Sequence, residues 1–259
     1  MPWTKQLALE SWRRFAEFVP ELRRPRYAAL VLGGATLACA GALVAGVTVA
    51  AALPYGALLV QSFYVLWAGA WMYAGFWLHR AAYRERYGAS AYRHLFFRFI
   101  IPAVGGAGAA LNFPLLVGGP QSLPPPVAYV IAGYLLVTAG LIEIRGKELF
   151  WNIDLRAFVY SVFPERGAVL TSGIFQWLRH PVYSTAVRFA FGVALVRNNL
   201  QAVLCAALIA AGLWLWAGIE ERELERGDPR YADYRRRVPA FFVLPPLRFW
   251  RYLLTGKSS

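Results

Sequence analysis

The chain has 259 residues, of which 58% are hydrophobic and 16% are charged, and its formal net charge is +13. Because a water-soluble domain carries about a quarter charged residues, this composition excludes an ordinary soluble domain. The apolar residues occur in blocks comparable with the about 20 residues that cross a bilayer as a helix. These blocks predict an all-α, polytopic transmembrane protein of about six spans: residues 28–53, 56–78, 96–118, 126–142, 182–196 and 200–218.

Basic residues are concentrated in alternate loops between these blocks. They lie before the first span, after the second and the fourth, and in the C-terminal tail, whereas the opposite loops hold only Arg197. The positive-inside rule then places both termini and the basic loops in the cytoplasm. Anionic lipids are therefore expected as partners, and Arg235–Arg237 are expected to contact their headgroups. Nucleic acid is not expected, because it would need a basic face with exposed aromatic residues on a soluble fold.

The first half of the chain, residues 1–142, is predicted to be a scaffold of about four spans. Residues 30–53 (LVLGGATLACAGALVAGVTVAAAL) are rich in glycine and alanine, and small residues let membrane helices approach one another closely. The frequent alanine and arginine are typical of a prokaryotic protein, which makes the inner membrane the expected location.

Several kinds of site are not expected. The histidines, His79, His94 and His180, are dispersed and show no zinc-ligand spacing with the two cysteines, so no metal site is predicted. Cys39 and Cys205 lie inside apolar spans and are interpreted as small core residues. A phosphate-binding loop and a nucleophile elbow are also missing from the sequence.

The second half, residues 143–259, is predicted to be the catalytic half. It begins with an amphipathic, aromatic stretch (IEIRGKELFWNIDLRAFVYSVFPERGAVLTSG) that is too charged to span and indicates an interfacial helix and loop. A helical hairpin over residues 182–218 follows, and an amphipathic tail ends the chain. The hairpin brings both of its ends back to the cytoplasmic face.

One end of this hairpin carries Arg179, His180 and Tyr183, and the other carries Glu220 and Glu221. We therefore expect groups far apart in the sequence to meet at one membrane interface.

The start of the hairpin suits an anion. Pro181 fits the first turn of a helix and favours an extended His180 just before it. A helix N-terminus attracts negative charge. The sequence thus predicts an anion site facing a pair of carboxylates, which would suit a zwitterionic, cationic ligand.

Two stretches of this half resemble a known family. GIFQWLRHPVYS at 173–184 and EERELERGDPRYADYRRRVPAFFVLP at 220–245 are similar to the paired signature of integral-membrane methyltransferases. These include the isoprenylcysteine carboxyl methyltransferases and bacterial phospholipid N-methyltransferases. The shared order is Arg-His-Pro-x-Tyr, a helical hairpin, two glutamates, Tyr-x-x-Tyr and Val-Pro. The tail departs from the pattern at Arg226, Pro229 and Ala240.

The resemblance implies S-adenosylmethionine as cofactor and a lipophilic acceptor that enters from the bilayer. It implies that Arg179 and Glu221 are the catalytic residues. The cofactor-binding residues that it implies are Leu170, Gly173, Phe175, His180, Pro181, Tyr183, Glu220, Glu221, Tyr231 and Tyr234. Arg188 lies within a span, where charge is costly and often functional. It is predicted to bind the substrate, with snorkelling or internal pairing as the alternative.

Other functions stay open at this point. Membrane sterol-type reductases share a similar C-terminal half and use a nicotinamide cofactor, although they would need a larger cleft and more spans. A third hypothesis is a non-enzymatic membrane protein, such as a small transporter or an assembly factor. A transporter should show repeated halves in its sequence. The acceptor could be a phospholipid amine, an isoprenoid carboxylate, a quinone-like ring or a hydrophobic thiol, and the oligomeric state is open.

Overall fold

The computed structural model describes residues 13, 15–163, 171–243 and 246–256, with backbone alone over 147–158 and at 160. Within these residues the chain is helical and has no β-strand, which confirms the predicted fold class. Two compact units divide it: residues 1–117 with 151–167, and residues 118–150 with 168–259. We call them unit 1 and unit 2. The predicted division into a scaffold (residues 1–142) and a catalytic half (residues 143–259) stays a prediction.

Four helical stretches of the described chain are long and apolar enough to cross a membrane: Pro25–Ala52, Gly56–Leu115, Pro125–Gly146 and Leu200–Gly227. The second stretch is a run of 60 residues that contains the second expected span and the third up to residue 115. Helix α8 (Pro181–Arg197) has 17 residues and is not among the four. The membrane character is therefore confirmed, and the number of about six spans stays a prediction.

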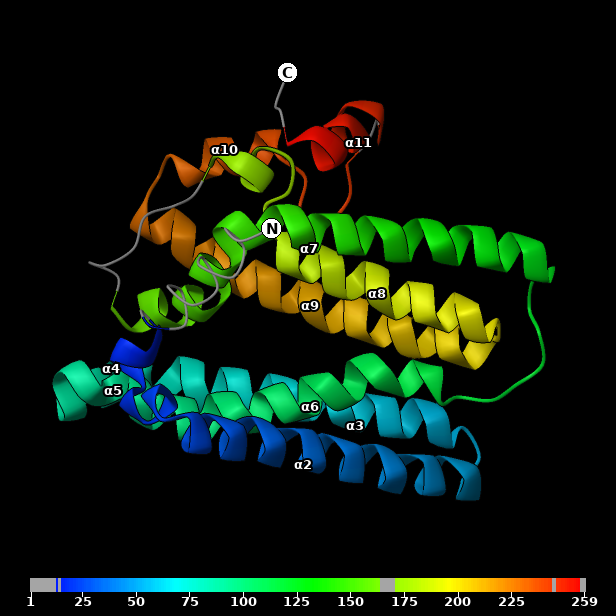
Figure 1. Ribbon diagram of the computed structural model, residues 1–259, viewed down its shortest axis with the longest axis horizontal. Coiled ribbons are helices and arrows are strands. Elements are labelled where there is room, and N and C mark those ends of the chain that lie inside the picture. The colour runs from blue at the N-terminus through cyan, green and yellow to red at the C-terminus, as the bar shows by residue number, and fades with distance from the viewer. Residues whose placement is uncertain (1–12, 14, 164–170, 244–245, 257–259) are drawn as a thin grey trace. The chain divides into compact units, whose positions relative to one another are not determined.

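Unit 1 is built on three long helical rods that lie side by side in Figure 1. They are α2 (Pro25–Ala52), α3 (Gly56–Ala70) continued by η2 (Trp71–Trp77) and α4 (Leu78–Tyr87), and α5 (Ala91–Leu95) continued by η4 (Phe96–Ile100), α6 (Ile101–Asn112) and η5 (Phe113–Leu115). Small residues permit this packing, as expected. A Cβ atom on Gly46 of α2 would clash with the Tyr64 hydroxyl of α3, and that hydroxyl donates to the Ala42 carbonyl.

Unit 1 is completed by short elements. They are η1 (Pro20–Arg23) and η3 (Gly88–Ser90). Helix α7 (Pro125–Val162) runs on well past residue 142, where the fourth expected span ended, and its residues from Trp151 belong to unit 1. There Val159 and Val162 pack with Tyr92 in a buried aromatic core.

Unit 2 contains the first part of α7, α8, α9 (Leu200–Gly227), and the short helices η7 (Gly173–Gln176), α10 (Tyr231–Arg237) and α11 (Pro246–Thr255). Helices α8 and α9 form the predicted hairpin. Its turn uses Asn198 in the left-handed conformation (φ 50°), and the Asn199 side chain caps α9 by accepting from the Ala202 amide at 2.8 Å. Asparagine tolerates both of these positions well.

The C-terminal end of the hairpin differs from the sequence prediction. We expected α9 to end at residue 218, where the apolar block stops, but the helix continues to Gly227. Glu, Arg and Leu are good helix formers, so the helix persists into the charged segment. Glu220 and Glu221 therefore lie on a rigid helix and not in a loop.

Helix α8 packs closely on α7 at Gly192, which gives a first testable prediction. A Cβ atom there would lie 2.7 Å from two Leu136 side-chain atoms. Gly192→Val is expected to destabilise unit 2 by about 1–3 kcal/mol through overpacking. The midpoint of thermal unfolding in detergent, followed by tryptophan fluorescence, measures this. Gly133→Val on α7 is the matched control, because a Cβ there meets no heavy atom within 4 Å. Equal midpoints for the two variants would contradict the packing.

Candidate active site

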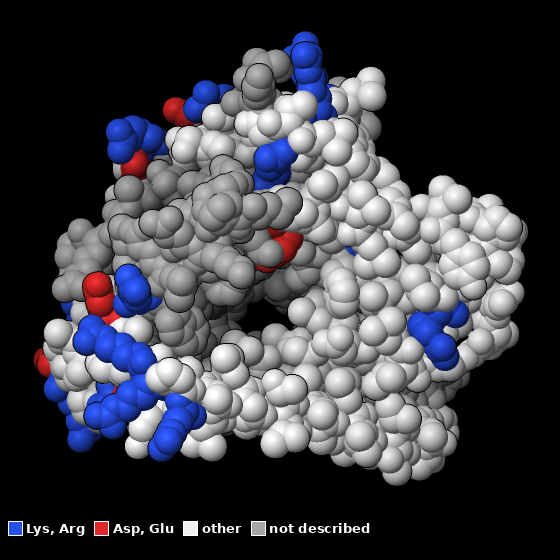
Figure 2. Space-filling model, viewed as in Figure 1, with Lys and Arg blue, Asp and Glu red and all other residues white. Residues whose placement is uncertain are grey.

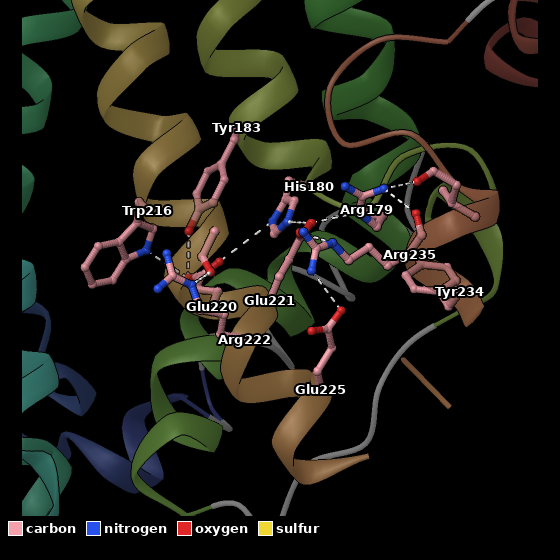
Figure 3. A network of polar contacts seen from close by, with 12 residues as sticks. Arg179, His180, Tyr183, Trp216, Glu220, Glu221, Arg222, Glu225, Tyr234 and Arg235 are labelled. Atoms are coloured by element: carbon pink, nitrogen blue, oxygen red, sulfur yellow. Dashed lines mark hydrogen bonds and ion pairs between the residues drawn. The ribbon is translucent and has the colours of Figure 1, made fainter. Parts of the chain in front are cut away.

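A network of charged side chains joins the start of α8 to the end of α9 (Figure 3). Its centre is Glu221, which is 4% exposed. Glu221 Oε1 accepts a hydrogen bond from Arg179 Nε at 2.7 Å and lies 2.9 Å from His180 Nε2. Its Oε2 forms an ion pair with Arg235 Nε at 3.0 Å. A carboxylate this deeply buried needs such partners, because an unpaired charge in a protein interior is very costly.

Glu220 forms a second node beside it. Its Oε1 accepts from the Tyr183 hydroxyl at 2.7 Å and from the Trp216 indole at 2.9 Å. Its Oε2 lies 3.7 Å from His180 Nδ1. The His180 imidazole therefore sits between two carboxylates, one at each ring nitrogen, and it stacks on the Tyr183 ring with a centroid distance of 5.2 Å.

The local sequence explains how these groups are presented. Pro181 occupies the first position of α8, as predicted, and His180 precedes the helix with a backbone that is non-helical but not fully extended (φ −124°, ψ 70°). The imidazole side chain is therefore attached to the backbone one residue before α8 begins. On α9, Trp216 and Glu220 are four residues apart and share one face.

A segment that follows α10 is fastened to the start of α8. We call residues 238–242 the tail strap. The Arg179 and His180 amides donate to the Pro239 and Ala240 carbonyls at 2.9 and 3.2 Å. The Arg179 guanidinium also donates to the Val238 carbonyl. Because these contacts involve backbone on both sides, the strap takes a fixed path over His180.

Two residues of α8 hold the far end of the tail strap. The Ser184 hydroxyl donates to the Phe241 carbonyl at 2.5 Å, and Arg188 donates to the same carbonyl at 3.4 Å. The Arg188 guanidinium lies 4.7 Å from the Phe242 ring centroid and is 3% exposed. Arg188 is therefore paired within the protein, and its predicted role in substrate binding stays a prediction.

Helix α10 contributes the two predicted tyrosines, and both are buried. The Tyr234 hydroxyl donates to the Phe175 carbonyl of η7 at 2.7 Å, so α10 is tied to the segment before α8. Burial raises the pKa of Tyr234 to about 12 and raises that of Tyr231 as well. The Tyr234 hydroxyl therefore remains protonated, and able to donate, at neutral pH.

This hydrogen bond gives a second prediction. Tyr234→Phe keeps the ring and removes only the hydroxyl, so it is expected to destabilise unit 2 by about 1 kcal/mol, the net contribution of one hydrogen bond. Thermal unfolding in detergent measures it, with Tyr129→Phe on α7 as the control, because Tyr129 is 55% exposed. An equal loss of stability in both variants would show that the bond to Phe175 contributes nothing.

The structure brings most of the predicted site residues together. Arg179, His180, Tyr183, Glu220 and Glu221 form one network (Figure 3). Of the other predicted residues, Pro181 is the first residue of α8, Gly173 and Phe175 lie in η7, and Tyr231 and Tyr234 lie in α10. Leu170 lies outside the described residues. We expected Arg179 and His180 to form an anion site facing the carboxylates across a pocket. Instead they contact the carboxylates directly, so the charges are paired.

Sequence reasoning missed two members of this network. Arg235 was expected to contact lipid headgroups, but it forms ion pairs with Glu221 and with Glu225. Trp216 was counted only as part of an apolar span. Trp216 lies one helical turn before Glu220, and this spacing could have predicted the contact between the two side chains. For Arg235 no such signal exists, because the pairing depends on how α10 folds back along α9.

Comparisons with known proteins agree with the resemblance stated above. Residues 128–227 match the sequence model of the phospholipid methyltransferase family. This match confirms the family resemblance, and it contains His180, Glu220 and Glu221 but not the tail strap. The matched region carries the α8–α9 hairpin of unit 2, and it also includes residues 151–167, which belong to unit 1.

A curated relative is the cobalt-zinc-cadmium resistance protein CzcN of Cupriavidus metallidurans. It is 32% identical over 119 residues, which are 45% of this chain and 52% of that protein. The match thus spans about half of the relative's length. In the described part of the chain no three His, Cys, Asp or Glu side chains are placed to hold a metal ion. No solved structure matches the chain.

Proposed function

We propose that this membrane protein, whose residues 128–227 match the phospholipid methyltransferase family, moves a methyl group from S-adenosylmethionine to a lipophilic acceptor at the membrane interface. One observation carries the proposal. The Arg-His-Pro segment and the Glu-Glu pair, which the sequence separates by about 40 positions, meet in one buried network inside the matched region. A network of this kind at a helix terminus is suited to a charged ligand.

The residues present fit the proposed cofactor by the chemistry of their side chains. S-adenosylmethionine carries an ammonium, a carboxylate, two ribose hydroxyls and a sulfonium. Glu220 and Glu221 provide carboxylate acceptors for the cation and the hydroxyls, and the Tyr183 hydroxyl and the Trp216 indole, which both donate to Glu220, hold that carboxylate in place. The N-terminal end of α8 attracts negative charge and suits the carboxylate.

When bound, S-adenosylmethionine supplies a methyl group on a positively charged sulfur, which is an electrophile. The chain's own residues then have three tasks: to bind, to orient and to exclude water. Methyl transfer is a displacement in line, so positioning contributes most and no covalent nucleophile is needed. The tail strap, fixed by Arg179 and Ser184, covers His180 and restricts its contact with water.

In this proposal Arg179 and Glu221 act together. Glu221 holds Arg179 and His180 in fixed orientations, and Arg179 holds the tail strap. Arg179 would also position an acidic acceptor, because a carboxylate is already a nucleophile and needs only a cation to place it. An amine acceptor would instead have to lose a proton first. We propose a phospholipid amine or an isoprenylcysteine-type carboxylate as the acceptor.

We place the reaction at the cytoplasmic face of a prokaryotic inner membrane. The support for the cytoplasmic face is the distribution of the Lys and Arg residues, most of which lie in the loops and termini that the positive-inside rule assigns to the cytoplasm. The family match favours methyl transfer over the nicotinamide-dependent reductase and over a non-enzymatic role.

Methyl transfer itself can be tested in vesicles. The purified protein is reconstituted in bacterial total lipid and incubated with S-adenosylmethionine labelled in its methyl group. Label is expected in the organic extract, above the level with heat-denatured protein. Mild base then separates the two acceptor classes, because methyl esters release methanol and N-methyl groups stay attached. An unlabelled extract from correctly folded protein, with both lipids and prenylated cysteine supplied, would refute the proposal.

A further inference from the structure

Unit 1 contains an open cleft of about 340 Å³ that shares no residue with the network on α8 and α9. Its lining combines aromatic and basic side chains: Tyr83, Tyr87, Arg93, His94, Phe97 and Arg98. This volume lies at the small end of ligand-binding pockets, which span about 300–1,000 Å³. The cleft can therefore take a group the size of a lipid headgroup but not a large cofactor.

The cleft is formed where α4 turns back into α5. Gly88 ends α4 with a positive φ of 53°, which allows the sharp reversal. The π-helix η4 then carries Phe97 and Arg98, and both are exposed. Short π-helical turns within a long helix often occur at functional sites.

The charge of the cleft is positive. Arg98 donates to the Tyr83 hydroxyl at 3.0 Å, which uses one of the five N–H donors of a guanidinium. Arg93 forms an ion pair with Glu21, so one acidic group offsets one of the two arginines. His94 stacks on Tyr87 with a centroid distance of 4.1 Å, which fixes the imidazole at the wall of the cleft.

The position in the chain points to a membrane interface. The cleft follows directly after the apolar run of α3 and η2, and basic side chains gather at this end of unit 1 (Figures 1 and 2). Tyrosine and arginine at the end of a membrane helix are typical of the headgroup region. Basic pockets between membrane helices on the cytoplasmic side bind the headgroups of anionic lipids.

We propose that this cleft binds the phosphate group of an anionic phospholipid, with Arg98 and Arg93 as its ligands and Phe97 against the adjoining glycerol and acyl chain. Arginine suits this task because its planar donors match phosphate oxygens in pairs. The site is separate from methyl transfer and does not depend on it.

Native mass spectrometry of the protein in detergent tests the site by titration with phosphatidylglycerol, phosphatidylcholine and glycerol 3-phosphate. Arg98→Gln is expected to weaken phosphatidylglycerol binding at one site by about fivefold, as loss of one basic residue at a lipid surface does. Phe97→Asp should weaken it further by repulsion, at a position that is 38% exposed. Arg26→Gln is the matched control, since Arg26 is an exposed arginine of unit 1 outside the cleft.

The outcomes separate the sources of the phosphate. Selective binding of phosphatidylglycerol that Arg98→Gln and Phe97→Asp weaken, and Arg26→Gln does not, supports the proposal. Glycerol 3-phosphate binding as tightly as the lipid would overturn it in favour of a soluble ligand. Equal binding by wild type and both cleft variants would also overturn it. If Arg98→Gln fails to fold, the Phe97→Asp variant alone decides.

Discussion

Replacing Glu221 with glutamine is expected to lower the rate of methyl transfer by at least about 100-fold, equivalent to about 2.7 kcal/mol of transition-state stabilisation. Glutamine keeps the size of the side chain but removes the charge that holds Arg179, His180 and Arg235. The Arg179 side chain is only 13% exposed. In Glu221→Gln its charge would therefore have neither a counter-ion nor full hydration. Breaking a buried pair from one side costs about 3–5 kcal/mol, so the unfolding midpoint should fall too.

The matched control for Glu221 is Glu225→Gln. Glu225 lies one turn further along α9 and forms its ion pair with Arg235 at 2.9 Å, but its side chain is 30% exposed. An exposed pair of this kind contributes less than about 1 kcal/mol, so the rate should stay within about twofold of wild type. Initial rates with labelled methyl groups decide the comparison. If Glu221→Gln kept more than half of the wild-type rate, Glu221 would not be part of the active site.

Replacing Arg179 with alanine is expected to loosen the tail strap and to slow methyl transfer strongly. Arg179 contacts Glu221 and also donates to the Arg235 and Val238 carbonyls, so it links α9 to the segment after α10. Removing it takes away both the ion pair and these two contacts. The rate should fall by at least about 100-fold, for the same reason as in Glu221→Gln.

Limited trypsin digestion separates the two variants. Arg235–Arg237 lie directly before the tail strap and offer cleavage sites once the strap opens. Arg179→Ala is expected to be cut there about tenfold faster than wild type, because cleavage follows the population of the open form. Glu221→Gln keeps the guanidinium contacts to the strap and should be cut much more slowly than Arg179→Ala. Arg222→Gln serves as control, because within the described residues the Arg222 side chain donates to the Gly218 carbonyl of its own helix and not to the strap. Equal digestion of all variants would mean that Arg179 does not hold the strap.

The sequence predicts those parts of the site that depend on local rules. Pro181 marks the start of α8 and keeps the backbone of His180 non-helical, and the Asn198–Asn199 turn reverses the chain so that α9 runs back to the same end. These features follow from the fixed geometry of proline and from the conformations that asparagine tolerates. The all-helical membrane fold likewise follows from the apolar blocks.

The remaining parts depend on packing between segments far apart in the chain. The tail strap is held by the Pro239, Ala240 and Phe241 carbonyls, and every residue has a carbonyl, so no side-chain pattern marks it. Arg235 belongs to a run of three arginines, and only the fold of α10 selects it as the partner of Glu221. The end of α9 was misplaced because hydropathy marks where a span stops, not where a helix stops.

The central claim is that the network between Arg179-His180 and Glu220-Glu221 binds S-adenosylmethionine, and calorimetry on the purified protein in detergent tests it most directly. We predict saturable binding to one site, weakened at least about tenfold in both His180→Ala and Glu221→Ala, with Glu225→Gln unchanged. Wild-type protein that shows a cooperative unfolding transition yet binds neither S-adenosylmethionine nor S-adenosylhomocysteine would contradict the claim.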